Sequence, residues 1–179
     1  MPRATRTTFR AIFWAWLIAG CLDISSAFTI YIWRGITLTW GLQGIAAGLI
    51  GREAAFKGGA ATAFLGLAIH FFIMLCVVLV FLAVSGVLPV LRRHPVVSGV
   101  IYGPIVYLLM YWVVVPVSRI GPRPHSLGND SLAIAIHICL IGLPIALIIS
   151  CMAKTDETSS SLPRPRLPCS SLLASWVPA

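Results

Sequence analysis

Acidic residues are the scarcest feature of this 179-residue chain: Asp and Glu together number 5, and all charged residues make up 10%. A water-soluble domain carries about 25% charged residues, so this chain has too few to cover a surface that faces water. Hydrophobic residues reach 59%, and the mean hydropathy is +0.96. This composition excludes an ordinary soluble domain and predicts an integral membrane protein in contact with a lipid bilayer.

Recognisable catalytic and metal-binding motifs are also missing. The sequence has no GxSxG, HExxH or Walker A motif and no paired acids, and its 5 cysteines lack the CxxC spacing of a zinc site or a disulfide framework. The net charge of +8 comes from basic residues near the ends of apolar runs rather than from one stripe that could follow nucleic acid. We therefore predict a non-enzymatic protein without metal, cofactor or nucleic-acid partner.

Four apolar runs are long enough to cross a bilayer, which takes about 20 helical residues. The runs are continuously apolar and do not alternate, which favours helices over barrel strands. The predicted fold is all-α, a polytopic bundle of four transmembrane helices at residues 11–33, 60–84, 96–118 and 131–151.

A fifth apolar stretch, GITLTWGLQGIAAGLI, is short and rich in glycine. We predict that residues 41–56 form an extra helix that lies at the membrane interface or re-enters the bundle. If this helix spanned the membrane instead, the C-terminus would move to the opposite side. Residues 152–179 are rich in Ser and Pro and are predicted to be a disordered tail.

Basic residues set the predicted orientation, because Lys and Arg collect on the cytoplasmic side. The basic residues before the first span and the Arg92–Arg93 pair favour a cytoplasmic N-terminus, formed by residues 1–10, and with four spans a cytoplasmic C-terminus. One side collects Arg3, Arg6, Arg10, Arg92, Arg93, Lys154, Arg164 and Arg166, and the other collects Arg34, Arg52, Lys57, Arg119 and Arg123.

The first span allows a second interpretation. The letters IAGC, ending at Cys21, resemble a bacterial lipoprotein signal that would be cut and lipidated at that cysteine. However, the apolar run continues to Trp33, which favours a retained helix with a packing face that includes Gly20, Asp23 and Ala27. Small residues on such a face let membrane helices approach closely.

Four polar side chains fall near the middle of the spans: Asp23, His70, Tyr107 and, about one turn away from that depth, His137. A charged group at mid-membrane costs about 2.5–3.5 kcal/mol on insertion scales, so these side chains should face the interior of the bundle. Further small residues mark the expected packing faces, namely Gly66, Gly99 and Gly103.

Three roles for this polar cluster are open. The four side chains could form structural hydrogen bonds, worth about 0.6 kcal/mol each in membranes. They could instead bind or conduct protons, because histidine titrates near neutrality and burial can bring a carboxyl group into the same range. The third role is a b-type haem held between His70 and His137.

Several segments resemble a group of small bacterial inner-membrane proteins of unassigned function. The segments are LQGIAAGLIG, EAAFKGG, LGLAIHF and SGVIYGPIVYLLMYWVVVPVS. The order of the spans, together with the placement of His70 and His137, is also similar to the YagU-like family, which is linked with acid tolerance; Asp23 does not carry over from that pattern. The resemblance implies four spans and a bacterial inner-membrane location. We expect a structural or stress-response role, and the GxxxG motif of the third span favours a homo-oligomer or another membrane protein as partner.

Overall fold

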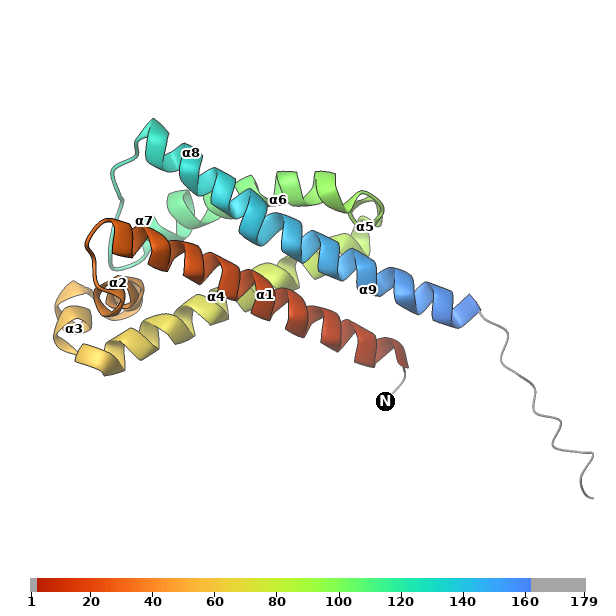
Figure 1. The fold of residues 1–179 in the computed structure, drawn as a ribbon, viewed down its shortest axis with the longest axis horizontal. Coiled ribbons are helices and arrows are strands. Elements are labelled where there is room, and N and C mark those ends of the chain that lie inside the picture. Colours follow the sequence, from red (N-terminus) through yellow and green to blue (C-terminus); the bar gives the residue numbers. More distant parts are fainter. Residues whose placement is uncertain (1–2, 162–179) are drawn as a thin grey trace, which may run out of the picture.

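The computed structural model describes the backbone of residues 3–161 and the side chains of residues 8–153. Four helical segments in it are long and apolar enough to cross a membrane: Thr8–Trp33, Gly59–Val87, Pro95–Val117 and Leu127–Ala153. No strand occurs among the described residues. The predicted fold class, an all-helical membrane protein with four spans, is confirmed (Figure 1).

Two spans are single helices and two are interrupted by π-helical turns. The uninterrupted helices are α1 (Arg3–Trp33) and α4 (Gly59–Val87). The third span consists of α6 (Pro95–Leu109), η1 (Met110–Val114) and α7 (Val115–Val117). The fourth consists of α8 (Leu127–Ile136), η2 (His137–Gly142) and α9 (Leu143–Ser161).

Several helices extend beyond the apolar runs that predicted them. The described part of α1 begins at Arg3, before the predicted start at residue 11, and the described part of α9 reaches Ser161. Residues 152–161, predicted as part of a disordered tail, are therefore helical. The rest of that tail, residues 162–179, lies outside the described residues.

The segment after the first span forms two helices rather than the single helix predicted at 41–56. They are α2 (Leu38–Ile50) and α3 (Arg52–Lys57). Gly51 separates them with a φ of 85°, a conformation that other residues rarely adopt. Figure 1 shows α2 nearly end-on while the long helices run across the view, so α2 lies across one end of the bundle.

The two ends of the bundle differ in what connects the spans. One end, called the α2 end, holds α2, α3 and the loop between α7 and α8. The other, called the α5 end, holds the short helix α5 (Val90–Arg93), the first turns of α1 and the last turns of α9 (Figure 1). The N-terminal end of α1 and the C-terminal end of α9 therefore lie on the same side, as four antiparallel spans require.

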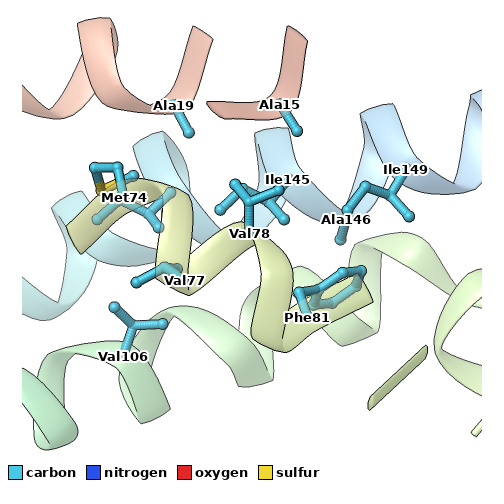
Figure 2. Close-up of a cluster of buried hydrophobic side chains, with 11 residues drawn as sticks. Ala15, Ala19, Met74, Val77, Val78, Phe81, Val106, Ile145, Ala146 and Ile149 are labelled. Carbon is cyan, nitrogen blue, oxygen red and sulfur yellow. The ribbon is translucent and has the colours of Figure 1, made fainter. Parts of the chain in front are cut away.

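The main apolar core occupies the half of the bundle towards the α5 end. Side chains from all four spans point towards one another there (Figure 2). In α1 the core positions are alanines, so α4 and α9 can pack close to its backbone. The buried members are Ala15, Ala19, Met74, Val77, Val78, Phe81, Val106, Ile141, Ile145, Ala146 and Ile149.

Glycines let the third and fourth spans touch through their backbones. A Cβ atom added at Gly99 would lie 2.7 Å from Leu143 Cα, and one added at Gly103 would lie 2.6 Å from Ile138 Cα. Gly142 faces both of these glycines from the other helix. The GxxxG motif is thus used for packing inside the chain. At the α2 end, Gly66 similarly lies against the backbone of α2 at Leu42.

The outer surface of the spans is apolar, as contact with lipid requires. Large hydrophobic side chains are exposed along all four spans, for example Phe72 (66%), Ile101 (55%) and Leu132 (50%). The four described cysteines are also exposed. At the α2 end the exposed tryptophans Trp33, Trp40 and Trp112 stand where membrane proteins carry an aromatic belt.

Candidate functional site: a polar cavity at the α2 end

A cavity of about 360 Å³ lies between the four spans in the half towards the α2 end. Its deep lining is buried, with His70 at 8% and Ile141 at 2% exposure. Its outer lining is exposed and includes Arg34, Arg123 and Asn129. The cavity therefore opens towards the α2 end and closes near mid-membrane, where the apolar core begins at Met74, Val77, Val106 and Ile141.

Asp23 and His70 meet at the deep part of this cavity. The Nδ1 atom of His70 lies 3.9 Å from Oδ2 of Asp23. The Nε2 atom of His70 lies 3.1 Å from the carbonyl oxygen of Gly20. Because a carbonyl only accepts, Nε2 carries a hydrogen and donates it. The second ring nitrogen therefore faces the carboxyl group, and one added proton between Nδ1 and Oδ2 makes the pair neutral.

His137 faces the same cavity from the fourth span. Its Nδ1 atom lies 2.8 Å from the carbonyl oxygen of Ala133 and donates to it. That bond leaves Nε2 without a hydrogen in the neutral ring. His137 and His70 both line the cavity that also holds Asp23. The cavity thus holds two titratable rings around one carboxyl group.

Two tyrosines pack against His137. The rings of Tyr107 and His137 are 5.6 Å apart and edge-on, and Tyr111 lies 4.8 Å from Tyr107. The side chain of Tyr107 is 2% exposed and lies behind His137, whereas Tyr111 lines the cavity. The Tyr107 hydroxyl is buried and forms no hydrogen bond of acceptable geometry. The side chain of Asp130 is a close neighbour of this hydroxyl.

The π-helical turns explain how His137 and Tyr111 reach this position. Each turn ends two residues before a proline, Pro116 after η1 and Pro144 after η2. Proline lacks an N–H group and clashes with the carbonyl four residues earlier, so the preceding helix widens by one residue per turn. The widened turns contain Tyr111 in η1 and His137 in η2, and both line the cavity.

The mouth of the cavity carries charged residues that the sequence did not single out. Arg34 Nη2 donates to Asn129 Oδ1 at 3.0 Å. The Arg123 guanidinium lies 5.9 Å from the centre of the Tyr111 ring. His125 Nδ1 and Asp130 Oδ1 are 3.4 Å apart. Arg34 could have been found, because it continues the helical stripe through Asp23, Ala27 and Tyr31; the loop residues follow no periodic signal.

The structure brings the four predicted polar residues together. Asp23, His70 and His137 line one cavity, and Tyr107 contacts His137 from behind. The predicted packing residues have different neighbours. Gly20 lies against the Phe71 ring, Ala27 lines the cavity, and Gly66, Gly99 and Gly103 sit at the helix crossings described above.

The surroundings of His70 bear on the predicted haem between His70 and His137, which stays a prediction. The Nε2 atom of His70 donates to the Gly20 carbonyl, and its Nδ1 atom lies 3.9 Å from Oδ2 of Asp23. Ligation through Nε2 would require breaking the hydrogen bond to Gly20, whereas ligation through Nδ1 would compete with Asp23. In the part of the chain that the structure describes, no group of three or more His, Cys, Asp or Glu residues is placed to hold a metal ion.

In comparisons with known proteins, no family model, curated protein or solved structure matches this chain. The resemblance to the YagU-like family therefore stays a prediction.

Proposed function

We propose that this protein is a proton-linked membrane transport component whose proton-binding site is the Asp23–His70 pair. The observation that carries the proposal is the 3.9 Å approach of these two side chains inside a cavity that opens to one side only. A carboxyl group and an imidazole at mid-membrane cost free energy. Such residues in membrane proteins usually pair with one another and mark a functional site. An aqueous route from the cavity mouth gives protons access to them.

A purely structural role is less well supported by the arrangement of these groups. A structural pair would be enclosed by packed side chains, as the core towards the α5 end is. The Asp23 side chain is instead 22% exposed, and a second histidine, His137, lines the same cavity. One added proton changes the net charge of the Asp23–His70 pair from −1 to zero. This property fits a site that exchanges protons better than a pair that only packs the helices.

The orientation of the cavity follows from the basic residues. If Arg34 and Arg123 belong to the cavity, three basic residues, Arg52, Lys57 and Arg119, remain on the α2 end. The α5 end carries more Lys and Arg residues than these three, which favours a cytoplasmic location for the α5 end. We propose that both termini are cytoplasmic, that the cavity opens to the outside, and that the host membrane is a bacterial inner membrane.

Infrared spectra of the reconstituted protein, recorded between about pH 5 and pH 8 where histidine pairs titrate, test this function. We expect a carboxyl band that changes over this range in the wild type and is absent in Asp23→Asn. Glu53→Gln is the matched control, because Glu53 is an exposed acid paired with Lys57 outside the cavity. An identical pH response in wild type and Asp23→Asn would refute the assignment.

A further inference from the structure

We propose that the cavity binds a small organic anion with an apolar body, such as a monocarboxylate, that enters together with the proton. This inference rests on the proposed function and names the substrate class of the same site. It is drawn from the two arginines at the mouth, the aromatic and aliphatic lining between mouth and floor, and the charge of the Asp23–His70 pair.

The two arginines at the mouth have no acidic partner. Among the described residues, no carboxylate lies within ion-pair distance of Arg34 or Arg123. Arg34 contacts the neutral amide of Asn129, and Arg123 contacts the Tyr111 ring. The nearby carboxylate of Asp130 instead lies 3.4 Å from Nδ1 of His125. Two guanidinium groups are left with free donors, which suit a carboxylate because of their planar fork.

The wall between mouth and floor suits an apolar body. It is formed by the ring of Tyr31, the ring of Tyr111 and the aliphatic side chains of Ile30, Ile73 and Met110. A volume of about 360 Å³ falls within the range of small-molecule sites, which are mostly apolar with a few polar groups that fix orientation. A carboxylate held at the arginines would direct its apolar end towards this wall.

The floor of the cavity couples the anion to the proton. Without the added proton, the Asp23–His70 pair carries a negative charge that repels an anion in the same low-dielectric space. With the proton the pair is neutral and the repulsion disappears, so each ligand favours binding of the other to the same degree. The other titratable or charged groups that face this space are Tyr31, Arg34, Tyr111, Arg123, His125, Asp130 and His137.

Direct binding of benzoate to the purified protein tests the inference. Benzoate combines a carboxylate with an apolar ring, benzylamine keeps the ring but reverses the charge, and acetate keeps the charge but lacks the ring. We expect benzoate to bind more tightly than either, and more tightly at low pH than at high pH. Because a charge-assisted hydrogen bond contributes about 1.5–3 kcal/mol, Arg34→Gln or Arg123→Gln should weaken benzoate binding about tenfold or more.

Arg52→Gln is the matched control, because Arg52 is an exposed arginine at the same end outside the cavity, and it should leave benzoate binding unchanged. Equal binding of benzylamine and benzoate to the wild type would overturn the inference without any variant. Unchanged benzoate binding in the Arg34→Gln/Arg123→Gln double variant would overturn it as well. The infrared response of Asp23 is measured separately, so proton binding can survive when anion binding fails.

Discussion

The half of the bundle at the α5 end is a packed apolar core, whereas the half at the α2 end encloses a polar cavity. The same four spans build both halves. Along α1, one face carries Ala11, Ala15 and Ala19 in the core and then Asp23 and Ala27 at the cavity. The spacing of four residues is unchanged, but the residue type changes at Asp23.

This difference shows how a small bundle can be open on one side only. Alanines and glycines let the helices meet through their backbones and exclude water. From Asp23 onward, polar side chains and the rings of Tyr31 and Tyr111 line the cavity, and α2 crosses α4 at Gly66. For the proposed transport function, a cavity open to one side and sealed to the other would be one of the two states that alternating access requires.

The largest expected effect is an all-or-none difference in water access between the two halves. In a background without the 5 native cysteines, Ala27→Cys should react with a membrane-impermeant maleimide, because Ala27 lines the cavity. Ala19→Cys should not react, because Ala19 is 0% exposed in the core. Labelling of intact cells would also report the side on which the cavity opens. Equal labelling of both cysteines would refute the distinction between a sealed and an open half.

A second large effect is expected where the third and fourth spans cross. Gly103→Ala would place a Cβ atom 2.6 Å from Ile138 Cα, so the two helices must move apart. Overpacking of this kind costs about 1–3 kcal/mol, and Gly103→Leu should prevent assembly of the bundle. Gly44→Ala on α2 is the control, because a Cβ atom there meets nothing within 4 Å. The free energy of unfolding of both variants can be measured in mixed micelles. Equal values for Gly103→Ala and Gly44→Ala would contradict the close backbone contact at Gly103.

The sequence predicted the spans well because bilayer thickness imposes a length and a composition that are visible in one chain. It also selected Asp23, His70 and His137, since polar groups inside apolar runs stand out. The sequence did not identify Arg123, His125 and Asp130 as site residues, because they lie in or next to a loop, where polar residues are common. The break at Gly51 and the π-turns before Pro116 and Pro144 depend on local backbone geometry that apolar patterning does not encode.

The smallest expected effect compares the same substitution in the two halves of the fourth span. Ile145 is 0% exposed in the core, whereas Ile136 lines the cavity and is half-buried. Ile145→Ala should lower the free energy of unfolding by roughly 2 kcal/mol, near the low end of large-to-small changes, because the unfolded helix remains in lipid and the loss is mainly that of packing. Ile136→Ala only enlarges an existing cavity, so its cost should be clearly smaller. Equal losses of stability in mixed micelles would mean that the half at the α2 end is packed as tightly as the core.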